Sequence, residues 1–149
     1  MAPLSQNEVD GLLTELTPKV DTPEKRTALG KEVYTKLFNA HPDYIKYFSK
    51  LSGLTKENVM QSESINYYAK SLVEELVDML KNGAKEGELK KLTEKSGKEH
   101  STRKISKEVF MSGLPIFVDY FNGALQSAEN KAAMKKFLEY IYPQIAAHI

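Results

Sequence analysis

Apolar residues recur every three or four positions through most of this 149-residue chain, and no stretch of useful length alternates between apolar and polar residues. A spacing of three to four places side chains on one face of an α-helix, whereas a half-buried strand needs a period of two. The sequence therefore predicts an all-α fold. We expect about seven to eight helices of unequal length with short connections, a pattern that is not typical of an up-and-down four-helix bundle.

Capping residues and prolines indicate where the helices begin and end. Ser5 and Glu8 form a capping box, and we expect Pro18 to end the helix that they start. Thr22 followed by Pro23 is an N-cap with proline at the first helical position. The other helices are expected from this cap to residue 40, over 42–48, from between 55 and 62 to 82, over 88–98, over 107–125 with a kink at 115, and from 129 to the end.

Length, charge and composition narrow the classes of function. A chain of 149 residues has the size of one domain, expected to span residues 1–149. The lack of cysteine excludes disulfides, a thiolate nucleophile and a zinc–cysteine site. The 21 basic and 20 acidic residues give no electrostatic reason to expect a nucleic-acid partner. The start, MAPLSQNEVD, lacks a secretory signal, and no apolar run approaches the roughly 20 residues of a membrane span, so we expect a cytoplasmic, intracellular protein.

The segment INYYAKSL places two tyrosines side by side within an expected helix. Tyr68 follows Ile65 by three residues and precedes Leu72 by four, so it shares their apolar face. Tyr67 lies about 100° away, on the polar face. Tyr68 is therefore expected to point inward and Tyr67 toward water. Periodicity alone favours Tyr68 as a core-edge tyrosine whose hydroxyl is satisfied.

Of the three histidines, His100 is the candidate ligand. His41 precedes a proline at a helix end and His148 is next to the last residue, so both have simpler explanations. His100 follows Ser96 by four residues and lies at the end of a partly apolar helix face. On the sequence pattern alone, a core histidine with satisfied hydrogen bonds is the favoured explanation. The more specific alternative is a metal ligand. One histidine cannot hold zinc, which needs three or four protein ligands, but it can hold haem iron because the porphyrin supplies four nitrogens.

The chain resembles the globins in its order of helices, in the proline start at Pro42, in Phe48 at the end of that short helix, and in His100 after a long gap. The stretches NVMQSESINYYAK, GKEHSTRK and FMSGLPIF make it most similar to the haemoglobins of trematode flatworms. The likeness runs nearly end to end. It implies a globin fold whose helices enclose haem b (iron protoporphyrin IX).

The resemblance implies a role for each matching residue. His100 matches the proximal histidine that binds iron, and Phe48 matches the phenylalanine that packs on the haem face. Tyr68 falls where most vertebrate globins have a distal histidine, and Tyr34 falls at the second-helix position that overhangs the ligand. Trematode haemoglobins resemble this chain in having tyrosine at both places. Two further residues are expected to pack against the haem, namely Leu72 and Ile105.

The implied function is reversible, high-affinity oxygen binding for storage, buffering or transport, without enzymatic activity. Ferrous haem shifts electron density onto the outer oxygen atom, and a phenol proton aimed there makes a hydrogen bond worth roughly 1.5–3 kcal/mol. Tyr34 is expected to be the main donor. Tyr68 either donates too, swings out as a gate, or binds ferric iron through its phenolate, in that order of preference. Carbon monoxide, which gains less from such a donor, and nitric oxide are the other expected ligands.

The haem propionates need cations near the rim of the pocket. Lys50, Arg103 and Lys104 are the candidates, and Arg103 is best suited to bidentate pairing with a carboxylate. No heptad run predicts a coiled coil, and we expect a monomer or a weak homodimer that binds neither membrane nor nucleic acid.

Two other classes of function stay open. A haem enzyme of the nitric oxide dioxygenase type needs only bound oxygen and an electron source, whereas a peroxidase usually needs a distal base with a pKa near the working pH. Tyrosine, with a pKa of about 10, is a poor choice for such a base. A chain that binds no haem would instead be a helical scaffold or interaction protein, with His100 and Phe48 as ordinary core residues.

Overall fold

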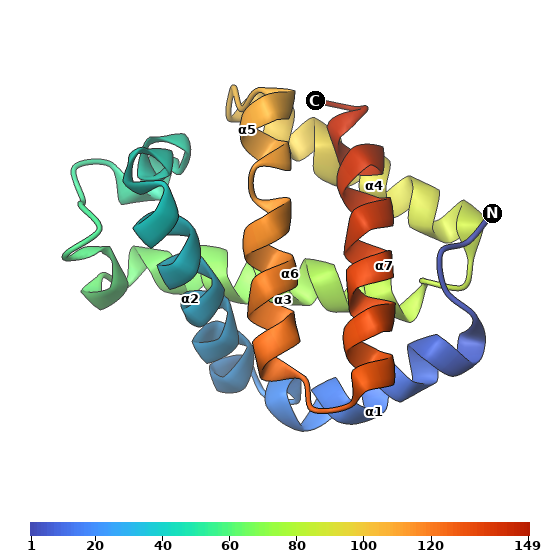
Figure 1. Ribbon diagram of the computed structural model, residues 1–149. Helices are drawn as coiled ribbons and strands as arrows, with labels where there is room; N and C mark the ends of the chain where they lie inside the picture. The colour runs from blue at the N-terminus through green and yellow to red at the C-terminus, as the bar shows by residue number, and fades with distance from the viewer.

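The computed structural model describes all 149 residues as seven α-helices and three short 3₁₀-helices, without a strand (Figure 1). The α-helices are α1 (Gln6–Val20), α2 (Pro23–Ala40), α3 (Ser64–Lys81), α4 (Glu86–Thr102), α5 (Lys107–Met111), α6 (Leu114–Ala124) and α7 (Ala128–Ala146). The connection between α2 and α3 contains the 3₁₀-helices η1 (Pro42–Tyr47), η2 (Ser49–Leu51) and η3 (Val59–Gln61). The all-α prediction is confirmed.

The two predicted N-terminal caps are present. The Ser5 hydroxyl accepts a hydrogen bond from the Glu8 amide at 3.2 Å, and the Glu8 carboxylate accepts one from the Ser5 amide at 3.0 Å. The Thr22 hydroxyl accepts from the Lys25 amide at 3.2 Å, and Pro23 is the first residue of α2. These bonds satisfy amides that have no partner within their own helix.

The predicted ends of two helices are wrong. Helix α1 continues past Pro18 to Val20, because a proline removes only its own amide, and the Lys25 ammonium group donates to the Pro18 carbonyl oxygen at 3.0 Å. Helix α4 is longer than 88–98 at both ends, so His100 lies inside its last turn. Because its buried face includes Thr93 and Ser96, which are polar, the periodicity of apolar residues did not reveal its full length.

Two other bounds differ in detail. Helix α3 begins at Ser64, two residues beyond the predicted window, because the preceding residues form η3. The predicted kink at Pro115 is a complete break, with α5 ending at Met111 and α6 beginning at Leu114. Pro115 lies in the first turn of α6, where its missing amide costs no hydrogen bond.

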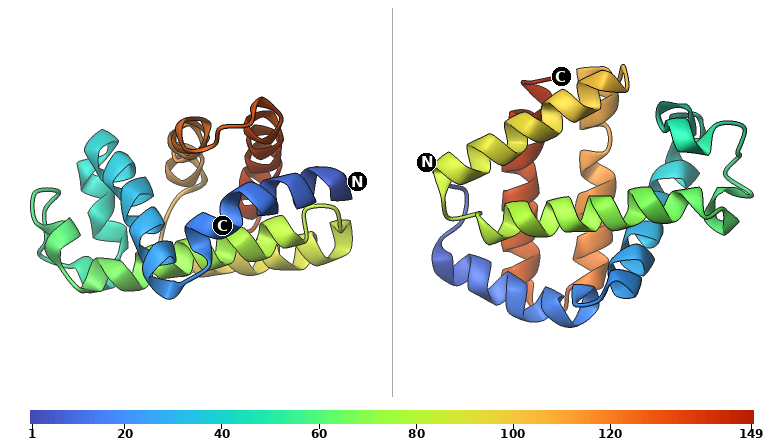
Figure 2. Two further views of the ribbon diagram at one scale, coloured as in Figure 1. Left: turned by 90° about the horizontal axis from the view of Figure 1, so that it is seen from below. Right: turned by 180° about the vertical axis from the view of Figure 1, so that it is seen from behind.

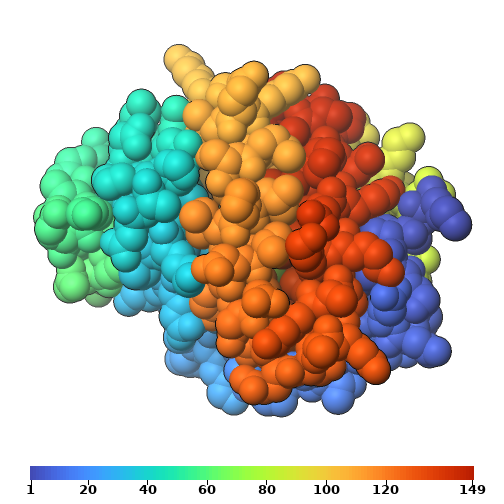
Figure 3. Space-filling view, in the orientation of Figure 1, coloured from blue at the N-terminus to red at the C-terminus, as the bar shows by residue number.

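Helices α6 and α7 lie side by side and antiparallel, and α3 crosses behind both of them (Figures 1 and 2). Helix α1 runs along the lower end of this pair in Figure 1, and α4 runs behind its upper end. In the space-filling view, side chains of α2, α6 and α7 pack against one another across the front face (Figure 3). None of the helices combines the length and apolar character that a membrane span requires.

The intracellular location and the extent of the domain stay predictions.

The buried side chains form two clusters. The larger joins residues of α1, α2, α3, α4, α6 and α7, and the smaller joins α2, the three 3₁₀-helices and the first half of α3. Leu72 packs against both clusters, and Tyr34, Phe48 and Tyr68 belong to the smaller one. Leu72 therefore lies where the two clusters meet.

Helix α2 crosses α3 at a very close approach that depends on Gly30. A Cβ atom added to Gly30 would lie 2.1 Å from the carbonyl oxygen of Ala69 and 2.7 Å from its Cα atom. These are backbone atoms of a buried helix, so they cannot move aside as the end of a flexible side chain can. The contact holds together the two helices that carry Tyr34 and Tyr68.

We expect Gly30→Ala to lower the free energy of unfolding by about 2–4 kcal/mol, since the two helices must separate to admit the methyl group. Chemical denaturation followed by circular dichroism measures this loss. Gly87→Ala is the matched control, because nothing lies within 4 Å of a Cβ atom at that helical position. An equal loss in both variants would mean that the crossing is not the cause.

Candidate functional site

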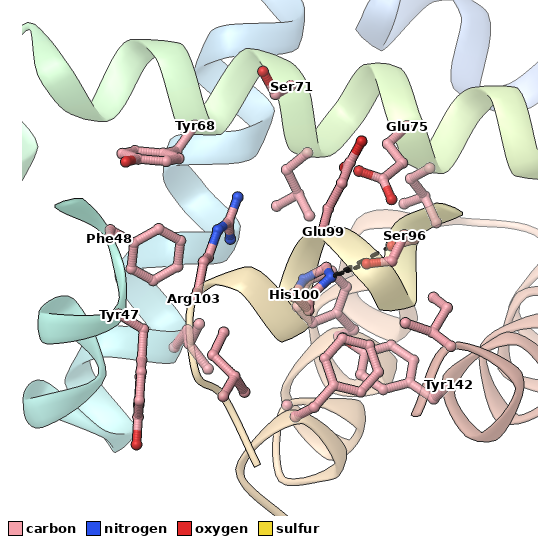
Figure 4. A pocket seen from close by; sticks show the side chains of 18 of the residues that line it. Tyr47, Phe48, Tyr68, Ser71, Glu75, Ser96, Glu99, His100, Arg103 and Tyr142 are labelled. Carbon is pink, nitrogen blue, oxygen red and sulfur yellow. Dashed lines mark hydrogen bonds between the residues drawn. The ribbon is translucent and has the colours of Figure 1, made fainter. Parts of the chain in front are cut away.

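A cavity of about 510 Å³ opens between α3 and α4 in the middle of the fold (Figure 4). It is lined by 26 residues, of which 18 are hydrophobic, and they come from α2, η1 and every α-helix from α3 to α7. A mostly apolar cavity with a few convergent polar groups is the usual form of a cofactor or small-molecule site. The polar groups are six phenols, three aliphatic hydroxyls, two carboxylates, one imidazole and one guanidinium.

His100 presents one imidazole nitrogen to a ligand. Its Nδ1–H donates to the Ser96 carbonyl oxygen at 2.7 Å, one helical turn earlier, and the Ser96 hydroxyl lies 3.5 Å from the same nitrogen. This bond selects the tautomer in which Nε2 carries the free lone pair. Burial lowers the pKa of His100 below its ordinary value, so the ring is neutral, as a metal ligand must be.

The position of α4 beneath the cavity is set by contact with the end of α7. A Cβ atom added to Gly97 would lie 2.5 Å from the Ile145 carbonyl oxygen and 2.6 Å from Cβ of His148. Glycine therefore allows α4 to lie directly on α7. Since His100 follows Gly97 by only three residues, this contact also places the imidazole.

Tyr34 presents a free hydroxyl to the cavity. Its side chain is only 6% exposed, and its ring lies 5.5 Å from the rings of both Phe38 and Phe48. No residue forms a hydrogen bond with the Tyr34 hydroxyl. Every completely buried side-chain polar atom has a hydrogen-bond partner, so the Tyr34 oxygen must be open to the cavity that it lines. Burial raises the pKa of Tyr34 above its ordinary value, so the hydroxyl keeps its proton. It is available as a donor to whatever enters the cavity.

Tyr68 points inward and Tyr67 points outward, as predicted. Tyr68 is buried, whereas Tyr67 is 57% exposed. The Tyr68 hydroxyl accepts a hydrogen bond from the Lys50 amide at 3.1 Å. Its ring meets Phe48 edge-on at 4.9 Å, and the guanidinium carbon of Arg103 lies 5.5 Å from its centre (Figure 4). Tyr68 is therefore attached to the connection between α2 and α3, at one side of the cavity.

The three predicted cations differ in position. Arg103 lines the cavity beside Phe48, with its guanidinium carbon 5.1 Å from the centre of that ring. The Lys50 ammonium group lies 5.1 Å from the ring of Tyr67, and Lys50, unlike Tyr67, does not line the cavity. Lys104 is exposed and does not line the cavity, and its φ of 60° ends the turn that follows α4. Arg103 is thus the cation that a carboxylate in the cavity would meet first.

The structure brings most of the predicted site residues together. The cavity lining includes His100, Tyr34, Tyr68, Phe48, Leu72, Ile105 and Arg103. It also includes Glu75, Gly113 and Tyr142, which the sequence did not single out, and Ser96, which the sequence placed only on the same helical face as His100. The spacing of four residues between Ser96 and His100 could have indicated their contact. Tyr142 had no such signal, because it is one of several aromatic residues on an apolar helix face.

The donor set fits a haem group. No group of three or more side chains is placed to hold a metal ion by itself. One neutral imidazole nitrogen is enough for an iron whose other four nitrogens come from a porphyrin. The largely apolar walls suit the porphyrin faces, and Arg103 suits a propionate.

Comparison with known proteins agrees with this chemistry. A family model described as Globin matches residues 31–145. A protein named globin from Isoparorchis hypselobagri is 42% identical over 98% of this chain and 99% of its own length. One from Dicrocoelium dendriticum is 38% identical over 99% of this chain and 98% of its own. Among solved structures, ferric myoglobin of Aplysia limacina has a TM-score of 0.81 at 21% identity, covering 97% of this chain and 98% of that one.

Proposed function

This chain belongs to the globin family, and from that premise we propose that it binds dioxygen reversibly and tightly at haem b, with a hydrogen bond from Tyr34. Family membership and the myoglobin-like fold support haem-based oxygen binding. The observation that carries the proposal is the pair of free groups in one apolar cavity, the His100 imidazole nitrogen and the Tyr34 hydroxyl. Their residues come from α4 and α2, which are distant in sequence.

His100 would hold the iron through Nε2, with Ser96 fixing the ring. When bound, the haem supplies a ferrous iron that takes up a diatomic gas. The bond from Nδ1–H to the Ser96 carbonyl oxygen raises the basicity of the imidazole and limits its rotation. Phe48 and Leu72, which line the cavity, would exclude water from it, and Arg103 would pair with a propionate.

Tyr34 would be the donor to the gas ligand. Its hydroxyl has no competing partner within the protein, and the rings of Phe38 and Phe48 restrain its own ring. A donor fixed in place before the ligand arrives loses little freedom on bonding. In a dry cavity, its bond to the partly negative oxygen ligand is stronger than it would be in water.

Tyr68 would act as a gate in preference to a second donor. Its hydroxyl accepts from the Lys50 amide, and its ring lies against Phe48 and Arg103 at one side of the cavity. Swinging the ring outward breaks this single hydrogen bond. The Lys50 amide would thus hold the gate closed, and Arg103 would link the gate to the haem propionate.

Replacing Tyr68 with Phe tests this role. A neutral hydrogen bond contributes about 0.5–1.5 kcal/mol, so its loss should speed both the entry and the escape of carbon monoxide by roughly two- to tenfold. The affinity should change by less than about twofold, since a gate alters both rates alike. Flash photolysis gives both rates. A faster escape of oxygen with unchanged entry would instead make Tyr68 a donor.

A binding role fits these residues better than a peroxidase role. Proton transfer at neutral pH needs a base whose pKa is near 7, and burial moves the pKa of Tyr34 still further above that value. The absence of enzymatic activity, the preference for a monomer or weak homodimer, and the binding of nitric oxide stay predictions.

The first experiment is an absorption spectrum of the purified protein with added haem, oxidised, reduced and under carbon monoxide. We expect a five-coordinate ferrous spectrum that shifts with carbon monoxide and with oxygen, and an oxygen equilibrium curve that saturates at low pressure. A protein that stays colourless with haem would refute the proposal. A ferric spectrum with a bound phenolate that is lost in Tyr68→Phe would identify Tyr68 as an iron ligand.

A further inference from the structure

The connection between α2 and α3, residues 42–62, forms one side of the cavity, and we call it the strap. Tyr44, Tyr47 and Phe48 of the strap line the cavity, and Phe48 lies across it from His100 (Figure 4). Apart from its two ends, the strap makes only two hydrogen bonds with the rest of the chain. No ion pair joins it to another element. These two hydrogen bonds are therefore the only polar restraints on the middle of the strap.

The two hydrogen bonds attach the strap to different parts of the molecule. The buried apolar side chains of the strap belong to the smaller cluster, together with α2 and the first half of α3. The bond between the Lys50 amide and the Tyr68 hydroxyl joins the strap to α3, within that cluster. The other bond leaves the cluster, because the Tyr44 hydroxyl lies 2.9 Å from Oγ of Ser112, in the turn between α5 and α6.

The bond between Tyr44 and Ser112 has a defined direction. Oγ of Ser112 donates to the Val109 carbonyl oxygen at 2.5 Å, so its single proton is already used and Tyr44 must be the donor. The Tyr44 ring is held by stacking on His41 at 4.4 Å and by an edge contact with Tyr47 at 5.9 Å. Donor and acceptor are therefore both held in position by their own neighbours.

The acceptor belongs to the wall of the cavity that supports His100. The ring of Phe110 lies 4.9 Å from the imidazole of His100, and Ser112 follows Phe110 by two residues. Phe110 and Tyr44 both line the cavity. The bond to Ser112 thus spans one edge of the cavity, from the side that carries Phe48 to the side that carries His100. Separating the two sides along this edge requires this bond to break.

We propose that Tyr44 is a positioning residue that ties the strap to the opposite wall and thereby slows the release of the group held in the cavity. Opening of the strap would be a local opening of the native fold, whose rate depends on the contacts that it breaks. The haem part of this inference rests on the proposed function, whereas the restraint on the strap does not.

The rate of haem transfer from the loaded ferric protein to an excess of a haem-scavenging apoprotein tests the proposal. Tyr44→Phe should release haem roughly two- to tenfold faster than the wild type, the effect of losing one neutral hydrogen bond. Ser112→Ala should act similarly, and the double variant should be no faster than the faster single variant, since both remove the same bond. Tyr47→Phe is the control, because Tyr47 lines the cavity from the same 3₁₀-helix without a hydrogen bond to α5 or α6, and it should match the wild type.

Amide hydrogen exchange tests the restraint on the strap without reference to haem. The Phe48 amide donates to the Ile45 carbonyl oxygen at 3.0 Å within the strap. It should exchange roughly two- to tenfold faster in Tyr44→Phe and at the wild-type rate in Tyr47→Phe.

Three results would overturn the proposal: unchanged haem release in Tyr44→Phe, additive effects in the double variant, or an equal effect of Tyr47→Phe. A protein that takes up no haem would refute the proposed function instead. Exchange of the Phe48 amide would then decide by itself whether Tyr44 restrains the strap, and an unchanged rate in Tyr44→Phe would show that it does not.

Discussion

The Tyr34→Phe protein is expected to release oxygen roughly 10 to 100 times faster than the wild type. The substitution removes one hydroxyl and leaves the ring between Phe38 and Phe48 in place. A hydrogen bond to a charged acceptor contributes about 1.5–3 kcal/mol, and each 1.4 kcal/mol is about tenfold in rate. Stopped-flow displacement of oxygen by carbon monoxide measures the off-rate directly.

Two comparisons separate the effect of the Tyr34 hydroxyl on bound oxygen from general effects of the substitution. The carbon monoxide off-rate should change much less, because bound carbon monoxide carries less negative charge. Tyr120→Phe removes a hydroxyl that donates to Glu32 at 2.8 Å outside the cavity, so its oxygen off-rate should stay at the wild-type value. An unchanged oxygen off-rate in Tyr34→Phe would eliminate Tyr34 as the donor.

The His100→Ala protein is expected to lose most of its affinity for haem. Changing an outer group around a metal ligand typically costs roughly 10- to 100-fold in affinity, and removing the ligand itself should cost more than this. Free imidazole should restore the five-coordinate ferrous spectrum, because it refills the space left by the side chain. Titration of the apoprotein with haem, with and without imidazole, measures both effects.

The matched control, Ser96→Ala, keeps the imidazole and removes a neighbouring hydroxyl. Ser96→Ala removes the hydroxyl 3.5 Å from Nδ1 but leaves the backbone carbonyl that accepts its proton at 2.7 Å. Haem binding should therefore stay near the wild-type value. Full haem affinity in His100→Ala, with a normal helical circular dichroism spectrum, would mean that His100 is an ordinary core residue and not the iron ligand.

Local signals in the sequence predicted most of the secondary structure. Capping at Ser5 and Thr22 and the apolar spacing around Tyr68 depend on neighbours within one helical turn, and the structure agrees with them. The errors at Pro18, at the start of α3 and at Pro115 are local, but the error in α4 arose from partners that are far apart in the chain. Helix α4 exceeds its predicted length because α7 buries its polar face, and this contact joins residues about 50 positions apart.

In the candidate site, too, the sequence indicated what depends on near neighbours and missed what depends on distant segments. Periodicity placed Tyr68 on the inner face, and resemblance to the globins assigned His100 and Tyr34 their roles. Neither indicated that the Tyr68 hydroxyl accepts from the Lys50 amide, because that bond depends on how the connection after α2 folds back over α3. The same holds for Tyr142, which lines the cavity beside Gly113 of the turn between α5 and α6.

The sequence by itself determined the all-α fold, the inward face of α3 and the identity of the one well-placed imidazole. Hydrophobic periodicity and capping act within a few residues, so they can be read without knowing which helices meet. Only the tertiary structure decided which hydroxyls are free and which are bonded. Hydrogen-bond partners and cavity walls are set by the close approaches of distant segments, such as Gly30 on Ala69 and Gly97 on Ile145, where the space available is smaller than one methyl group.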